Sequence, residues 1–137
     1  MTNTSKHKLQ ATKQKELFVQ FANLFANVNQ NESSVLFETL FTDAEKVMFI
    51  KRLAIILMLS KNHSTYAIAK TLYVSDSTVR EIKKKYVLGM FSSIVDATKN
   101  KSFDAVKFWA TVDILVRAGM PSQGKDRWKK VLGNEKK

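Results

Sequence analysis

Apolar side chains recur at three- and four-residue spacing along most of the 137-residue chain. This is the period of an α-helix with one apolar face. Near the N-terminus it predicts a helix from about Lys13 to Ala26 with a face rich in aromatic rings. That face consists of Leu17, Phe18, Phe21, Leu24 and Phe25. After a turn at residues 27–31, Ser33 or Ser34 can cap a short second helix that runs through Leu40.

A helix that is apolar on more than one face is predicted next. Thr42, followed three residues later by Glu45, matches the capping box that starts many helices, and Asp43 adds a favourable charge at the helix N-terminus. The helix is expected to end at about Leu59 or Lys61. Its apolar residues are Val47, Met48, Ile50, Leu53, Ala54, Ile55, Leu57 and Met58. A helix of this kind belongs at the centre of a core or between subunits.

The stretch from Ser64 to Tyr86 has the spacing of a helix-turn-helix. Ser64 caps a predicted helix at residues 65–72, and Ser75 caps a second one from residue 76 to about residue 91. Two helices that cross over a three-residue turn need apolar side chains where they touch and a small one where they approach most closely. The apolar set is Ile68, Leu72, Val74, Val79 and Ile82, and the small residue is Ala69.

The turn between these two helices departs from the usual pattern at one position. Its first residue is often a glycine with positive φ, and in this chain it is Tyr73. Either the backbone is strained at this residue or the turn has a slightly different geometry.

The last third of the chain predicts a short helix at about residues 94–97 and a longer one from residue 103 to about residue 118. Ser102 caps the longer helix, and Gly119 with Pro121 ends it. Its inward side chains are expected to be Val106, Phe108, Trp109, Val112, Ile114, Leu115 and Val116. Because the sequence contains no strand pattern, we expect an all-α fold with six or seven helices.

The composition narrows the classes of partner and of chemistry. The formal net charge of +11 favours a polyanionic partner. Without cysteine the chain can form neither a disulfide nor a thiolate zinc site. His7 and His63 have no carboxylate at ligand spacing, so we expect both to be solvated. The carboxylates form no paired cluster and the four glycines no phosphate-binding loop, so we expect no enzyme, cofactor or metal.

A membrane segment is not expected either. The most apolar run, residues 55–59, is far shorter than the roughly 20 residues that span a bilayer. The N-terminus lacks the apolar core of a signal peptide. We therefore expect a cytoplasmic, nucleoid-associated protein.

A helix-turn-helix places the exposed N-terminal face of its second helix in the major groove of DNA. The predicted base contacts are Ser77, Thr78, Arg80, Lys84 and Tyr66, and the predicted phosphate contacts are Ser64, Thr65, Lys70, Lys83 and Lys85. Arg80 suits bidentate contact with guanine. Asp76 and Glu81 on the same surface restrict what docks there, because a carboxylate accepts from cytosine but repels phosphate.

These residues resemble the tryptophan repressor family. The resemblance covers roughly Glu16 to Ala118 and is strongest from Leu40 to Lys85. It depends on Leu40, Thr42 and Glu45 at the start of the central helix, Arg52 within it, and Ser64, Leu72 and Thr78 in the helix-turn-helix. It implies an all-α homodimer in which the N-terminal helices and the last helix of the two chains interlock. Two helix-turn-helix heads would then face successive major grooves.

The predicted organisation has three parts. Residues 1–12 are polar, basic and aperiodic, which predicts a disordered arm. Residues 13–119 form the helical domain that resembles the family, with the helix-turn-helix at 64–86. Residues 120–137 form a basic extension with a short helix at 125–132, which is a candidate for additional DNA contacts.

The corepressor pocket of the family is matched only in part. By the resemblance, Thr42, Arg52 and Thr78 occupy pocket positions. The second pocket arginine of the family aligns with Glu81, and a carboxylate repels a ligand carboxylate and cannot stack as a guanidinium does. We therefore predict a vestigial pocket that does not bind tryptophan, and no small-molecule effector.

The sequence favours a sequence-specific, repressor-like transcriptional regulator that binds double-stranded DNA as a homodimer. One alternative is the DNA-recognition subunit of a transposase or recombinase system, which needs a separate catalytic partner protein. Another is a nonspecific nucleoid-associated protein, which predicts a steep salt dependence without sequence preference.

Overall fold

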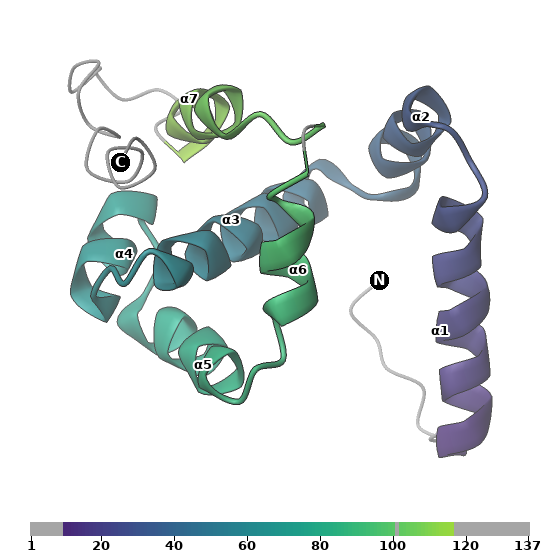
Figure 1. Cartoon of the computed structure of the whole chain (residues 1–137), viewed down its shortest axis with the longest axis horizontal. Helices are drawn as coiled ribbons and strands as arrows, with labels where there is room; N and C mark the ends of the chain where they lie inside the picture. Colours follow the sequence, from purple (N-terminus) through teal and green to yellow (C-terminus); the bar gives the residue numbers. More distant parts are fainter. Residues whose placement is uncertain (1–9, 101, 117–137) are drawn as a thin grey trace. The chain divides into compact units, whose positions relative to one another are not determined.

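The computed structural model describes residues 10–100 and 102–116. Within these ranges the chain is all-helical, as predicted, with seven helices and no strand (Figure 1). The helices are α1 (Ala11–Ala26), α2 (Gln30–Leu40), α3 (Asp43–Ser60), α4 (Thr65–Leu72), α5 (Asp76–Val87), α6 (Ser92–Ala97) and α7 (Ala105–Val116). The chain divides into two compact units, one that ends at Lys46 and one that begins at Val47.

In the first unit, an aromatic cluster joins α1, α2 and the residue that follows α2. The Phe21 and Phe25 rings meet edge to face at 5.4 Å between centroids, and Phe37 lies 5.4 Å from Phe41. Among the described residues of this unit, no side chain is buried. Phe18, on the predicted aromatic face, is 63% exposed. The described part of the first unit, residues 10–46, therefore has an apolar face but no buried core.

The sequence predicted the N-terminal cap of α3 correctly and that of α2 incorrectly. Thr42 and Glu45 form both hydrogen bonds of the predicted capping box, at 2.9 and 3.2 Å, and these bonds lower the pKa of Glu45. The start of α2 was predicted too late, because Asn29 rather than a serine caps it. The Asn29 side chain accepts from the Glu32 backbone N–H at 2.8 Å and donates to the Glu32 carboxylate at 2.7 Å. Asparagine caps a helix at least as well as serine.

An ion-pair cluster joins α2 to the first turn of α3. The Lys46 ammonium lies 2.9 Å from the Glu38 carboxylate and 3.1 Å from that of Asp43, and these two partners raise its pKa. Glu38 and Lys46 are eight residues apart on different helices, so helical spacing within one segment could not predict their contact.

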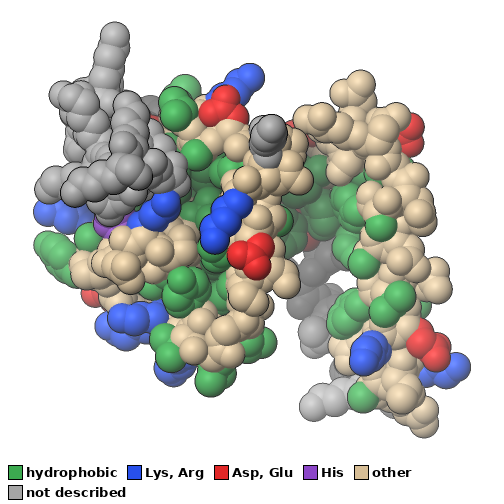
Figure 2. Space-filling view, in the orientation of Figure 1, with side chains coloured by type: hydrophobic (Ala, Val, Ile, Leu, Met, Phe, Trp, Pro, Cys, Tyr) green, Lys and Arg blue, Asp and Glu red, His purple; other side chains and the backbone are tan. Residues whose placement is uncertain are grey.

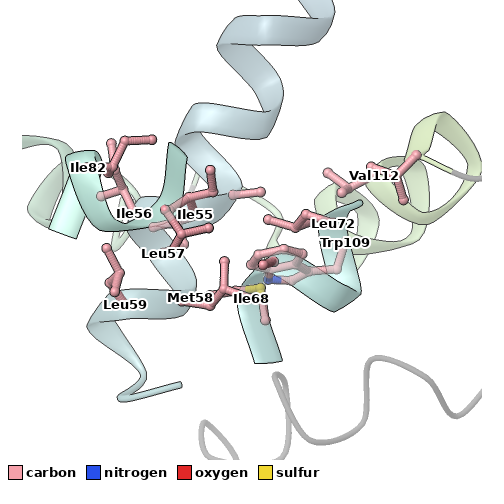
Figure 3. Close-up of a cluster of buried hydrophobic side chains, with 14 residues drawn as sticks. Ile55, Ile56, Leu57, Met58, Leu59, Ile68, Leu72, Ile82, Trp109 and Val112 are labelled. Carbon is pink, nitrogen blue, oxygen red and sulfur yellow. The ribbon is translucent and has the colours of Figure 1, made fainter. Parts of the chain in front are cut away.

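In the second unit, the core forms around the C-terminal half of α3. Six consecutive residues, from Ala54 to Leu59, are buried, as expected for a helix that is apolar nearly all round. In Figure 3, side chains from α4, α5 and α7 surround this half of α3. The buried residues from those helices are Ile68, Ala69, Leu72, Val79, Ile82, Trp109, Val112 and Val116.

Helix α7 contributes a narrower apolar face than the sequence predicted. Trp109, Val112 and Val116 are buried at helical spacing, whereas Val106 and Ile114 are exposed. The prediction that Val106 and Ile114 point inward is therefore wrong, because the described core covers only one side of this helix. Its start was also misplaced, since the Asp104 carboxylate, rather than Ser102, accepts from the Lys107 N–H at 3.0 Å.

Two further boundaries differ from the predictions. Helix α5 ends at Val87 because Gly89 adopts a left-handed conformation, with φ of 78°, and the Met90 N–H donates back to the Lys85 carbonyl. Helix α1 begins at Ala11, inside the predicted arm. Residues 1–9, the expected stop at Gly119 and Pro121, and the extension at 120–137 lie outside the described residues.

His63, expected to be solvated, is half-buried. Its Nε2 atom is buried and has no hydrogen-bond partner within the part of the chain that the structure describes. Its backbone N–H donates to the Met58 carbonyl at 3.1 Å, which holds the residue against the end of α3. Burial lowers the pKa of the imidazole below its usual 6.5.

We expect the stability of the fold to decrease as the pH falls below 6.5. The imidazole of His63 binds a proton more tightly in the unfolded chain than in the folded chain, because burial lowers its pKa. The folded state therefore has its full stability above pH 6.5 and loses part of it as the pH falls below that value. The midpoint of urea unfolding should therefore be lower at about pH 5.5 than at about pH 7.5, and His63→Gln should reduce the difference. Glu45 remains ionised over this range because its pKa is lowered from 4.5. Equal losses in the two proteins would contradict the expectation.

Candidate nucleic-acid interface

The two helices of the predicted helix-turn-helix, α4 and α5, begin at serine caps and pack against each other. The Ser64 hydroxyl oxygen accepts from the Ala67 N–H at 3.1 Å. The Ser75 hydroxyl oxygen accepts from the Thr78 N–H at 3.2 Å. Both caps were predicted from the sequence. They fix where each helix begins and so which α5 side chains point outward.

The contact between α4 and α5 uses the residues that the spacing selected. Ile68, Leu72 and Val79 are fully buried, and Ile82 is nearly so. Ala69 is buried as well, which is consistent with its predicted place at the close approach of the two helices. Helix α5 buries Val79 and Ile82, and Tyr86 packs against the same core, whereas its other side chains are exposed and accessible to a partner.

The turn between the helices is strained at Tyr73. This residue ends α4 in the left-handed conformation, with φ of 55° and ψ of 48°, and its N–H donates to the Ala69 carbonyl. Of the two alternatives that the sequence left open, the structure shows the usual turn with a tyrosine in the glycine position. A side chain in this conformation costs about 1–2 kcal/mol.

An open surface depression of about 530 Å³ lies between the start of α4 and the outer face of α5. It brings together four of the predicted DNA contacts: Thr65, Arg80, Lys83 and Lys84. Val87 and Leu88, which also line it, were not predicted as site residues. The sequence could have indicated them, because Val87 and Leu88 are apolar but do not share the helical spacing of the buried Val79 and Ile82. Such residues are expected on the exposed surface. Figure 2 shows Lys and Arg side chains on the surface formed by these two helices.

Three hydroxyl groups meet at the N-terminus of α5. The Ser75 hydroxyl lies 3.1 Å from that of Ser77 and 2.7 Å from that of Thr78. Ser77 and Thr78, both predicted base contacts, are exposed, so they are accessible while they support the cap. On α4, the Lys70 ammonium lies over the Tyr66 ring, 5.8 Å from its centroid, which places a predicted phosphate contact beside a predicted base contact.

The two acidic residues of α5 are also exposed, and one of them is paired. The Glu81 carboxylate accepts a hydrogen bond from the Lys84 ammonium at 3.1 Å, within a single turn of the helix. Asp76 lies in the first turn of α5, where a negative charge stabilises the helix N-terminus. The outer face of α5 therefore carries both donors and acceptors and is not uniformly basic.

A cavity of about 350 Å³ lies beneath one side of α5, between this helix and the middle of α3. Arg52, Thr78 and Glu81, three of the four predicted pocket residues, line it, together with apolar Ile55 and Phe91. The fourth, Thr42, lies in the first unit, where it forms the capping box with Glu45.

Two lysines change the charge of this cavity. Lys51 was not predicted as a pocket residue, although its helical spacing from Met48 and Ile55 indicates the same face of α3. Lys85 was predicted as a phosphate contact, and the structure places it at this cavity instead of at the depression beside Arg80.

Comparisons of the chain with protein-family models, with curated proteins and with solved structures found no significant match. Among residues 10–100 and 102–116, no group of three or more acidic or histidine side chains is placed to hold a metal ion. No helix in those ranges is long and apolar enough to cross a membrane.

We expect Tyr73→Gly to be more stable than Tyr73→Ala by about 1 kcal/mol. Both substitutions remove the tyrosine ring and the interactions it makes, so their difference reports only the effect of a Cβ atom at positive φ. In an ordinary helical position the order is reversed, because glycine lowers helix stability relative to alanine. Urea unfolding followed by circular dichroism measures the difference. A more stable alanine variant would show that the turn tolerates a side chain without strain.

Proposed function

We propose that this protein is a sequence-specific transcriptional regulator. It binds DNA through α4 and α5 and acts as a homodimer. The observation that carries the proposal is the outer face of α5. It presents Ser77, Arg80 and Lys84 to solvent on a helix whose start is fixed by a cap and whose opposite face is buried against α4. A rigid, exposed and partly basic helix of this kind fits the major groove.

The charge of the second unit supports the same proposal. From Lys51 to Met90 the sequence has eight basic and two acidic residues, so a polyanion is attracted to this part of the chain. The acidic pair Asp76 and Glu81 favours a specific mode of binding, because carboxylates on the docking face oppose contact with arbitrary phosphates.

The surface of the first unit supports association of two chains. Helix α1 buries no residue, and its aromatic-rich face leaves Leu17 and Phe18 more than half exposed. A monomer rarely leaves a contiguous face of this kind uncovered, whereas homodimer interfaces are enriched in such surfaces. A two-fold dimer would present two α5 helices to the two halves of a palindromic site.

We also propose that tryptophan is not a corepressor. The cavity beneath α5 contains Glu81 at the position where the resemblance expects a second arginine, and its cationic residues, Lys51, Arg52 and Lys85, lie elsewhere on the wall. A carboxylate in that place removes the second of the two guanidinium groups that would hold a ligand carboxylate and stack on an indole, and it leaves only Arg52.

In vitro selection from a random duplex library should yield a preferred sequence, and Arg80→Ala should lose the preference at one base-pair position. Bidentate contact of arginine with guanine contributes about 1–3 kcal/mol of discrimination. The matched control is Lys83→Ala, which removes one positive charge from the neighbouring surface. It should weaken binding to all sequences alike and reduce the slope of log K against log salt by about 0.9.

Two results would contradict this expectation. Selection of no sequence over random duplex at moderate salt would show nonspecific binding. Uniform weakening by Arg80→Ala would make Arg80 a phosphate contact.

The exposed face of α1 gives a separate test of the homodimer. Phe18→Glu should weaken association at least tenfold in sedimentation velocity over a range of concentrations, since burial of a phenylalanine contributes about 1.5–3 kcal/mol. Val19→Glu is the matched control, because it changes an exposed apolar residue of α1 on the opposite side of the helix. A wild-type monomer, or equal effects of both substitutions, would refute the proposed interface.

A further inference from the structure

We infer that Glu81 determines specificity by accepting a hydrogen bond from the amino group of a cytosine, within one base pair of the guanine that Arg80 contacts. The inference rests on the proposed DNA-binding function and specifies the base composition of the bound site. It assigns Glu81 a positive role in recognition, where the charge of the surface alone suggests only repulsion of phosphate.

The geometry of α5 places the two side chains together. Ser77, Arg80, Glu81 and Lys84 follow one another at the spacing of a single helix face, and all four are exposed. The opposite face carries the buried Val79 and Ile82. An α-helix rises about 1.5 Å per residue, whereas base pairs are stacked about 3.4 Å apart. Consecutive helix residues therefore reach the same base pair or its neighbour.

The chemistry of the two groups is complementary to a guanine and a cytosine. The Arg80 guanidinium only donates hydrogen bonds, and an ionised Glu81 only accepts them. In the major groove, guanine presents two acceptors, and cytosine presents an amino donor. Adenine also has an amino group, but its N7 acceptor lies beside that group and repels a carboxylate. Cytosine is therefore the preferred partner of Glu81.

The ion pair between Glu81 and Lys84 makes the binding affinity depend on whether the cytosine is present. Its two side chains are 69% and 73% exposed and lie 3.1 Å apart, so water screens the pair and DNA can open it at little cost. When Glu81 turns to a cytosine, Lys84 becomes available to a phosphate. On a sequence without the cytosine the pair remains closed, and one positive charge of the interface stays neutralised.

The test is selection from a random duplex library with the full-length chain and its Glu81→Gln variant. Asp96→Asn is the matched control. Asp96 on α6 forms another exposed ion pair three residues apart, with Lys99 at 3.7 Å, and its substitution changes the net charge by the same amount. Circular dichroism confirms that all three proteins are equally helical.

We expect the wild type to select a cytosine next to the position that depends on Arg80. In Glu81→Gln the preference should change to adenine, because an amide side chain bonds both N6 and N7 of that base. The original discrimination, roughly 5- to 150-fold, should be lost. On sequences without the cytosine, where the wild-type ion pair stays closed, the slope of log K against log salt should become steeper by about 0.9 in Glu81→Gln, because Lys84 is then free to contact a phosphate. Asp96→Asn should change neither quantity.

The outcomes separate this inference from the proposed function. A sequence-specific wild type that selects no cytosine at that place, or a Glu81→Gln variant with unchanged preferences, overturns the role of Glu81 and leaves specific DNA binding intact. A change of base preference in Asp96→Asn equal to that in Glu81→Gln overturns it too, since net charge would then be the cause. A wild type without any preference overturns the proposed function itself.

Discussion

Burial of the C-terminal half of α3 is the interaction on which the second unit depends. Six consecutive residues from Ala54 to Leu59 are buried, so every side of the helix must be covered by another element. Each large apolar side chain of this kind contributes about 1.5–3 kcal/mol when buried. Helices α4 and α5 have 8 and 12 residues and would be marginal alone. They form because they cover α3 as well as each other.

The same packing prepares α5 for contact with a partner. Its burial of Val79 and Ile82 fixes the rotation of the helix, and the Ser75 cap fixes its start. Arg80 and Lys84 consequently lie on the exposed side, beside Thr65 of α4. The left-handed Tyr73 is part of this arrangement, since strain in one turn residue is offset by the buried contacts on either side of it.

The first unit presents the opposite situation. Its aromatic rings contact one another, but none of its described residues is buried, and Leu17 and Phe18 on the apolar face of α1 are more than half exposed. The ion pair of Lys46 with Glu38 joins α2 to the start of α3, and the Thr42 capping box fixes where α3 begins, but neither adds a core. In the proposed homodimer, a second chain would supply the missing apolar contacts and so stabilise the first unit.

Local signals in the sequence predicted much of this protein. Apolar spacing and capping residues gave the all-α class, the caps at Thr42, Ser64 and Ser75, and the buried residues between α4 and α5. These signals gave wrong helix boundaries where two capping or terminating residues lie within a few positions of each other. Asn29 and Asp104, and not the nearby serines, cap their helices, and the left-handed Gly89 ends α5 earlier than the apolar spacing predicts.

Only the tertiary structure decided which apolar residues are covered and which polar residues meet. Val106 lies three residues before the buried Trp109, which is the spacing of a core residue, yet it is exposed because the described core lies on one side of α7. Lys51 and Lys85 belong to different helices, and the docking of α5 on α3 brings both to one cavity. Helical periodicity determines the faces of each element because it is a local property of the chain. Contacts between elements depend on how those faces pack, which the sequence of one element does not contain.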